Sequence, residues 1–438
     1  MREFNTGSFP KGLSFMLGSM SKWLYDESPT SGLKFEEPLA ELKAKIEESG
    51  SKVFQDMIEQ MLIKNTHRTT VEMVPSKTLE DETLNEEKER LAAIKESLND
   101  DKLDEIIEST KKLKELQASE DPPEARATIP SLTLEDLKRE VTEYPIEVTE
   151  NEADSSVTVV RHELVSTSGI AYADLGVDLS KIPLEDVPLL SIFTRMMTEN
   201  GAGGLSDIEL SRKIGTYTGG VSVSLSLTGL KKDGAPQNAV SDGSHLMTKL
   251  FIRGKATRDR TEDLFSIYKL ILTEANLDSQ TKVLEILRES KAKLEAGIQG
   301  SGHQFSQSRM KARYSPSSYI AEKMSGISYL DTLKELEKMA ENDWPSLLER
   351  FEGIRKNLLD QSTCRDGMIL NLTGDKEVLD TIQPSVEEFL KELPGDAESS
   401  KLPDFYKETH PWVLAAREEM AEKAPLEDEG FVVPSQGM

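Results

Sequence analysis

The sequence has few of the features that mark secreted, membrane-spanning or nucleic-acid-binding proteins. Its 438 residues include one cysteine, Cys364, so no disulfide can form within the chain, which suits a reducing compartment. No run approaches the ~20 consecutive apolar residues that span a bilayer. The first residues contain neither an apolar signal core nor an Arg- and Ser-rich leader. We therefore expect a soluble chain with no membrane partner and no leader of its own.

Positively charged residues are also far fewer than negatively charged ones. The chain has 53 Lys and Arg residues against 79 Asp and Glu residues, which gives a formal net charge of −26 at pH 7. Binding to nucleic acids relies on Lys and Arg at the phosphates, so this balance argues against a nucleic-acid partner. Most of the acidic charge serves solubility, and a secondary effect is the attraction of basic peptides.

Complete catalytic and metal-binding motifs are missing from the sequence. No two of its histidines lie at the i, i+4 spacing that places two imidazoles on one metal ion. His162-Glu163 begins an H-E-x-x-H pattern, but position 166 is serine, so we interpret these residues as a surface pair. Cys364 has no histidine close in sequence to activate its thiol, and Gly201–Gly204 is only a weak candidate for a phosphate loop. We expect no cofactor in this chain. The histidines are His67, His162, His245, His303 and His410.

A charged stretch without aromatic residues or glycine runs from residue 75 to residue 126. Its apolar residues recur at helical steps in two successive segments, and Asn99-Asp100-Asp101 between them can cap the start of a second helix. Asp121-Pro-Pro then ends the pattern. We predict an antiparallel helical hairpin over 76–126, held between two globular parts; the alternative is a free coiled-coil arm. The apolar residues are Leu84, Leu91, Ile94 and Leu98, then Leu103, Ile106, Leu113 and Leu116.

The segments on both sides of the hairpin mix helical and strand patterns, which predicts an α+β fold. Before the hairpin, we expect helices over 12–25, 36–49 and 51–64 and a short strand over 67–75, as if the chain began in mid-domain. After it, strands over 157–161 and 169–177 are expected to pair, and two further strands flank an exposed loop over 228–244. The remaining predicted strands are 218–227, 245–253 and 368–373, and the remaining helices are 185–198, 207–215, 261–274, 278–299, 314–324, 329–342, 344–361, 375–393 and 412–424.

The segment 299–330, QGSGHQFSQSRMKARYSPSSYIAEKMSGISYL, is the most suggestive candidate for a binding site. Ser301, His303, Arg309 and Arg313 lie where two helices are expected to meet. Arginine forks bind carboxylate and carbonyl oxygens with two parallel hydrogen bonds, so this cluster is a candidate substrate-binding groove for peptides. The alternative is a glycine-jointed helix connection with solvated arginines.

Several long segments, in the same order along the chain, resemble the presequence proteases. These enzymes are the organellar branch of the pitrilysin-type zinc metallopeptidases, whose signature is the inverted H-x-x-E-H motif. The match is with their middle portion and extends over nearly the whole chain. The segments include NTGSFPKGLSFMLGSMSKWLYD (5–26), IPSLTLEDL (129–137), IGTYTGGVSVS (214–224), IRGKATRDRTEDLF (252–265), GSGHQFSQSRMKA (300–312) and GFVVPSQ (430–436).

The resemblance implies a domain organisation. In that family, two halves of the enzyme, each of two homologous α+β domains, are joined by a long helical hairpin. Residues 1–75 then correspond to the end of the second domain, 76–126 to the joint and 127–400 to the third domain. The segment 401–438 is either a charged tail or the start of a truncated next domain.

The resemblance also implies a function. The zinc ligands and catalytic glutamate of the family match no position here, so zinc belongs to the full-length enzyme and this chain has no catalytic residue of its own. The expected role is that of a central segment, inactive alone, of a metalloendopeptidase that degrades unfolded peptides such as cleaved targeting presequences. Its partners are those peptides and the missing N- and C-terminal domains, in the mitochondrial matrix or chloroplast stroma. The alternative is a non-catalytic peptide-binding or scaffold protein derived from the family.

Overall fold

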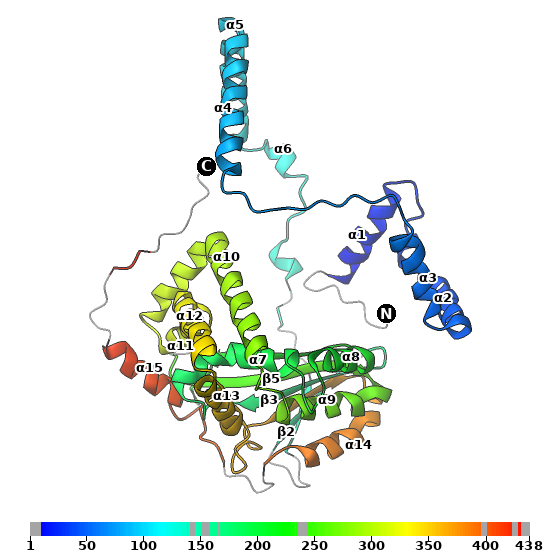
Figure 1. Cartoon of the computed structure of the whole chain (residues 1–438), viewed down its shortest axis with the longest axis vertical. Helices are drawn as coiled ribbons and strands as arrows, with labels where there is room; N and C mark the ends of the chain where they lie inside the picture. The colour runs from blue at the N-terminus through cyan, green and yellow to red at the C-terminus, as the bar shows by residue number, and fades with distance from the viewer. Residues whose placement is uncertain are drawn as a thin grey trace. The chain divides into compact units, whose positions relative to one another are not determined.

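The chain folds into two compact units in a computed structural model, one within residues 6–142 and the other within 143–438. We call them the helical unit and the sheet unit and describe each by itself. Figure 1 gives the labels of the helices and strands. The structure describes residues 10–137, 139–140, 145–150, 157–164, 166–232, 234, 243–395, 401–422 and 428–430.

The helical unit begins with the three helices that the sequence predicts. They are α1 (Lys11–Trp23), α2 (Glu36–Ser49) and α3 (Lys52–Ile58), and α3 continues into a short π-helical turn over Glu59–Ile63. A 3₁₀ turn at Ser31–Leu33 connects α1 to α2. Gly50 ends α2 at φ +58°, and its N–H donates to the carbonyl of Ile46. Glycine adopts this left-handed conformation without the steric cost that a Cβ brings.

The strand predicted over 67–75 is not formed. Val71 and Met73 alternate as a strand would, but Val71, Met73 and Val74 are 77%, 90% and 72% exposed, and residues 67–75 form no strand in the described part of the unit. A strand is stable only when its backbone groups pair with a neighbour. The sequence has the pattern of a strand here, but the described residues of the unit provide no neighbouring strand for it to pair with.

Two long helices follow, as the hairpin pattern predicts. They are α4 (Leu79–Ser97) and α5 (Asp100–Ala118), and they run in opposite directions from their common turn (Figure 1). The Asn99 side chain caps α5 by accepting a hydrogen bond from the N–H of Lys102 at 3.0 Å. The apolar side chains of both helices remain about half exposed, for example Leu91 at 50% and Ile106 at 49%. Two short turns, α6 (Pro123–Arg126) and η3 (Leu134–Asp136), complete the unit.

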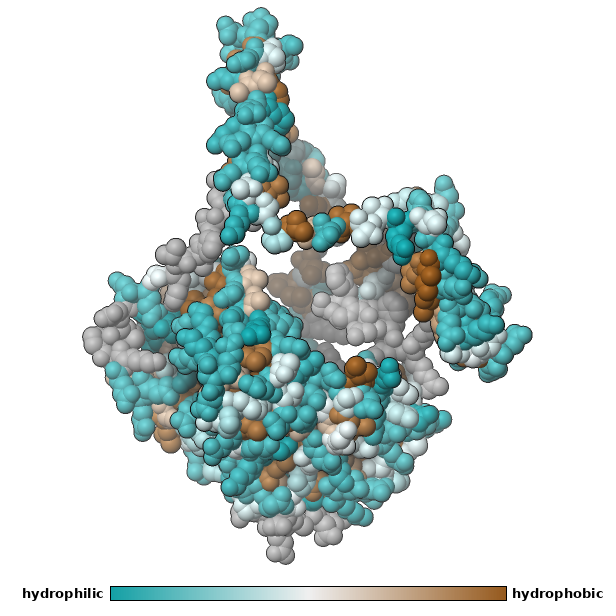
Figure 2. All heavy atoms as spheres, in the orientation of Figure 1, coloured by the Kyte–Doolittle hydropathy of each residue, from teal (hydrophilic) through white to brown (hydrophobic). Residues whose placement is uncertain are grey.

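Helices α1 and α3, with the π-helical turn after α3, leave many apolar side chains exposed, visible in part as brown spheres in Figure 2. Exposed apolar surface of this extent marks an interface or an aggregation-prone site. These apolar residues lie on α1, on α3 and on the turn that follows α3, and each is about 38% exposed or more. They are Leu13, Phe15, Met16, Leu17, Met20, Trp23, Phe54, Met57, Ile58, Met61, Leu62 and Ile63.

We expect the purified chain to self-associate through this surface. The double substitution Leu17→Lys and Leu62→Lys should reduce the associated fraction at micromolar concentration, because it places charge on residues now 49% and 61% exposed. Light scattering coupled to size exclusion measures the change. The control, Glu47→Lys with Glu48→Lys, adds more positive charge at polar positions of α2 and should leave association in place. An entirely monomeric wild-type chain would contradict the expectation.

The sheet unit is built on a six-stranded sheet among the described residues. Its strand order is β1-β2-β6-β3-β5-β4, and every neighbouring pair is antiparallel except β2 and β6. The fold is thus α+β with a mixed sheet, as predicted in class. The strands are β1 (Ile146–Glu150), β2 (Thr158–Glu163), β3 (Ile170–Asp178), β4 (Val221–Gly229), β5 (Leu246–Thr257) and β6 (Ile369–Gly374).

One predicted pairing in this sheet is wrong. The strands at 157–161 and 169–177 were expected to pair with each other, but β6 lies between β2 and β3 and pairs with both. Leu370 and Leu372 of β6 are buried, so this short apolar strand needs a central place in the sheet. Its place is determined by burial rather than by proximity in the sequence. The short edge strand β1 was not predicted.

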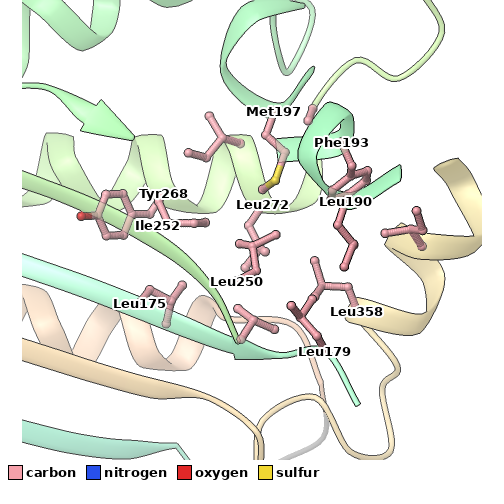
Figure 3. Close-up of a cluster of buried hydrophobic side chains, with 14 of the residues drawn as sticks. Leu175, Leu179, Leu190, Phe193, Met197, Leu250, Ile252, Tyr268, Leu272 and Leu358 are labelled. Atoms are coloured by element: carbon pink, nitrogen blue, oxygen red, sulfur yellow. The ribbon is translucent and has the colours of Figure 1, made fainter. Parts of the chain in front are cut away.

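Helices cover the face of the sheet that carries the buried side chains of β3 and β5. Leu175, Leu250 and Ile252 meet residues of α7 and α9, including Met197, Tyr268 and Leu272 (Figure 3). Each fully buried side chain of this size stabilises the fold by about 1.5–3 kcal/mol. The helices and turns are η4 (Leu184–Leu189), α7 (Leu190–Glu199), α8 (Asp207–Tyr217), η5 (Arg258–Arg260), α9 (Thr261–Thr273), α10 (Gln280–Ala312), α11 (Pro316–Ser325), α12 (Ile327–Asn342), α13 (Trp344–Leu358), α14 (Lys376–Glu392) and α15 (Pro411–Glu422).

The described part of the segment 401–438 is not a free tail. Trp412, Val413 and Ala416 of α15 are buried in the core of the sheet unit. The indole N–H of Trp412 donates to the carbonyl of Ile182 at 2.7 Å. Helix α15 therefore packs as part of the sheet unit. None of the helices in the described ranges is long and apolar enough to cross a bilayer.

Candidate functional site

The candidate site lies on α10 and α11, which form one antiparallel pair after a break in α10. Ser301 interrupts the helical geometry at φ −136° and ψ 33°, between Gly300 and Gly302. Glycines on both sides lower the cost of such a break, because they lack the side chains that stabilise a regular helix. The sequence predicted a helix ending at 299; the structure continues it, kinked, to Ala312.

A cavity of about 300 Å³ lies between the second half of α10 and α11. Phe305 gives it an apolar wall, and hydroxyl, amide and charged groups line the rest. None of the four predicted site residues lines it. The lining residues are Gln304, Phe305, Ser308, Lys311, Ser318, Ala321, Glu322, Ser325 and Gly326.

Arg309 lies in the last turn of α10, Arg313 is the C-cap residue of the same helix, and both contact Glu429. Arg309 holds its carboxylate with two parallel hydrogen bonds, Nε to Oε2 at 2.8 Å and Nη2 to Oε1 at 2.8 Å. Arg313 Nη2 lies 3.3 Å from Oε2. These guanidinium groups, Arg309 first, lower the pKa of Glu429 to about 2. Both arginines thus contact a carboxylate of the same chain, and the binding of a peptide by them stays a prediction.

Glu322 supports Arg309 from the interior. It is 2% exposed and accepts hydrogen bonds from the N–H of Ser328 at 3.0 Å, from the Ser328 hydroxyl and from Arg309 Nη1 at 3.4 Å. A buried carboxylate requires such partners, since an unpaired one is costly. Gly326 makes room for it, because a Cβ there would lie 2.6 Å from the Glu322 side chain.

Ser301 and His303 do not join the arginine cluster. The helix from 302 to 312 rises about 1.5 Å per residue, so His303 lies about 9 Å along the axis from Arg309, and Ser301 still further. His303 is exposed and Ser301 is half-buried at the kink. Sequence reasoning missed Glu322 and Glu429. Glu429 has no local signal, because it is 120 residues from Arg309, whereas Glu322 lies within the segment 299–330, only 13 residues from Arg309.

The weaker candidates carry no site in the described residues. The loop at Gly201–Gly204 has three glycines at positive φ, but its neighbouring cavity is lined by the carboxylates of Glu209 and Glu274, which oppose phosphate binding. Cys364 is buried, its thiol donates to the carbonyl of Pro394, and burial raises its pKa, as in an inert cysteine. Among the described residues, no group of three or more His, Cys, Asp or Glu side chains is arranged to hold a metal ion.

Comparisons with known proteins point to one family. The family model described as "Peptidase M16C associated" matches residues 73–336. A chloroplastic and mitochondrial presequence protease of Arabidopsis thaliana is 35% identical over 437 residues, covering 100% of this chain and 37% of that protein. A mitochondrial presequence protease of Kluyveromyces lactis is 27% identical, covering 91% and 38% respectively. The chain therefore spans less than half the length of these relatives.

Among solved structures, a peptidase M16 inactive domain from Pseudomonas fluorescens is 14% identical. Its TM-score is 0.38, over 59% of this chain and 53% of that one.

Proposed function

Because the chain belongs to the peptidase M16C-associated family, as a presequence-protease-like member, we propose that it is a peptide-handling segment, without metal ligands, of a zinc metalloendopeptidase. The observation that carries the proposal is the 35% identity along the whole chain to a presequence protease of which it spans 37%. The enzyme acts on unfolded peptides such as cleaved targeting presequences, and this chain alone is inactive. The relatives named here support the mitochondrial matrix or the chloroplast stroma as its location.

The described residues do not fit the zinc ion of the family. His410 accepts the N–H of Trp412 at Nδ1 and hydrogen-bonds Thr248 through Nε2, and the Nδ1 of His245 faces the carbonyls of Phe405 and Glu408. These imidazoles are buried and committed to backbone and hydroxyl partners. The metal and the catalytic base belong to other parts of the enzyme, and no step of hydrolysis is assigned to this chain.

The role of this chain is to bind and confine the peptide. Its net charge of −26 attracts the basic peptides that targeting sequences usually provide. Arg309 and Arg313, and at the kink Ser301 and His303, are the proposed substrate-binding residues. The exposed apolar residues of α1 and α3 and the unpaired segment 67–75 support a further assignment, in which 1–75 ends one peptidase domain that the missing residues complete. In this arrangement, 76–126 is the joint and 127–400 the next domain.

The proposal predicts that the purified 438-residue chain contains no stoichiometric zinc and does not cleave an unfolded basic peptide. Elemental analysis after incubation with zinc and washing measures the first property, and mass spectrometry of the peptide measures the second. Mixing with separately produced flanking domains should yield hydrolysis, because these supply the metal ligands. Stoichiometric zinc together with cleavage by the isolated chain would contradict the proposal.

A further inference from the structure

The carboxylate that contacts Arg309 and Arg313 belongs to Glu429, within the described residues 428–430. We call residues 428–430 the strap tip. Asp428, Glu429 and Gly430 are all exposed, and the side chain of Glu429 is 34% exposed. The contacts described for the tip are those of Glu429 with Arg309 and Arg313. These three residues include no apolar side chain, and the contacts described for them are charge-assisted hydrogen bonds and ion pairs of Glu429.

The site itself is prebuilt on rigid elements. Arg309 uses Nη1 to contact the buried Glu322 and presents Nε and Nη2 outward as a fork. Glu322 is in turn fixed by Ser328. The edge of a guanidinium group that carries Nε and Nη2 can bind a carboxylate with two parallel hydrogen bonds. Glu322 contacts Nη1 of Arg309, so Nε and Nη2 of the same guanidinium group favour an anion at its outward edge.

Space for a ligand adjoins the fork. A cavity of about 240 Å³ lies beside Arg309 and the strap tip, and it is open to solvent. An extended peptide that placed a carboxylate on the fork would therefore extend along this cavity. The residues lining the cavity are Arg309, Ile327, Ser328, Asp331, Glu429 and Gly430.

We propose that Arg309 and Arg313 form a binding site for the C-terminal carboxylate of an unfolded peptide, and that Glu429 is its occupant in the absence of peptide. The choice of an unfolded peptide rests on the function proposed above. The choice of a carboxylate rests on the geometry around Glu429 alone. The strap tip and the peptide terminus compete for the same two nitrogen atoms of Arg309.

Glu429 and a peptide carboxylate would compete for the same arginines, and this competition sets the apparent affinity for the peptide. A tethered group acts at an effective concentration of the order of millimolar, so a free peptide at micromolar concentration displaces it poorly. Removing the negative charge of Glu429 removes the competitor without changing the arginines. The wild-type chain should therefore bind weakly, and the Glu429→Gln variant should bind at least about tenfold more tightly.

Fluorescence anisotropy with three unfolded peptides tests the site, each labelled at its N-terminus. One has a free C-terminus, one is the same peptide as a C-terminal amide, and one is an amide with an internal glutamate. Glu429→Gln should bind the free-acid peptide at least about tenfold more tightly than wild type, with the gain falling as salt rises. The control Asp428→Asn removes an equal charge one residue away and should behave as wild type. Adding Arg313→Gln to Glu429→Gln should abolish the gain and leave the Arg309–Glu322 contact intact.

Equal binding of the acid and amide peptides, or no gain in Glu429→Gln, would overturn the proposal. An equal gain for the peptide with the internal glutamate would overturn the C-terminal assignment in favour of acidic side chains. These outcomes are separate from the zinc and cleavage measurements. The arginine site can fail while the chain remains a non-catalytic segment, and zinc-dependent cleavage by the isolated chain would leave the binding result unchanged.

Discussion

Replacing Trp412 by alanine is expected to lower the free energy of unfolding of the sheet unit by about 3–5 kcal/mol, the range for a large aromatic side chain removed from a core. Trp412 is 2% exposed, donates its indole N–H to Ile182 and packs edge-on against His410, with ring centroids 5.3 Å apart. The substitution leaves a cavity and an unpaired carbonyl. Urea denaturation followed by far-UV circular dichroism measures the loss.

Trp23→Ala is the matched control for this substitution. Trp23 is 63% exposed on α1, so its replacement should change the stability of the sheet unit by less than about 0.5 kcal/mol. Similar losses for the two variants would mean that α15 is not anchored in the core.

Lowering the pH from 6.5 to 4 is expected to cost the sheet unit about 3 kcal/mol through His410 alone. Burial lowers the pKa of this histidine to about 4 from its ordinary value of 6.5, and the negative charge of Asp178 opposes the shift in part. Below pH 6.5 the unfolded chain binds a proton that the folded chain does not take up until about pH 4. Stability is therefore complete above pH 6.5 and falls through this window, at about 1.4 kcal/mol per pKa unit.

The His410→Gln variant isolates this contribution. Glutamine cannot titrate, so the variant should lose less stability than wild type between pH 6.5 and pH 4, whatever its stability at neutral pH. Urea midpoints measured at intervals across the window provide the comparison. Carboxylates with lowered pKa, such as Asp360 at about 2, act mainly below this window. Parallel pH dependences for the two proteins would show that His410 is not the titrating group.

Local structure was largely predictable from the sequence, because its signals are local. Helical spacing located α2, α4 and α5, and the Asn99 cap lies where the residues between the two apolar stripes predicted it. Strand neighbours were not predictable in the same way. The place of β6 between β2 and β3 depends on which apolar strand is buried most deeply, and more than 190 residues separate β6 from β3.

The sequence identified Arg309 and Arg313 but not the glutamates that they contact, Glu322 and Glu429. Arg309 and Arg313 were singled out as candidate peptide-binding residues. The structure pairs both with the carboxylate of Glu429, and their role in peptide binding stays a prediction. No pattern near Arg309 indicates that residue 429 would occupy the site. The break at Ser301 follows from its flanking glycines, but the continuation of α10 beyond it depends on packing against α11 and α12.

The mass of the protein that carries this sequence in its source cells tests the central claim most directly. Immunoblotting with an antibody against the sheet unit measures it. A function as one segment of a presequence-type peptidase predicts a species near twice the 48.8 kDa of this chain or above, since the chain spans 37% of the Arabidopsis relative. A single species at 48.8 kDa would contradict that claim and favour a non-catalytic peptide-binding protein.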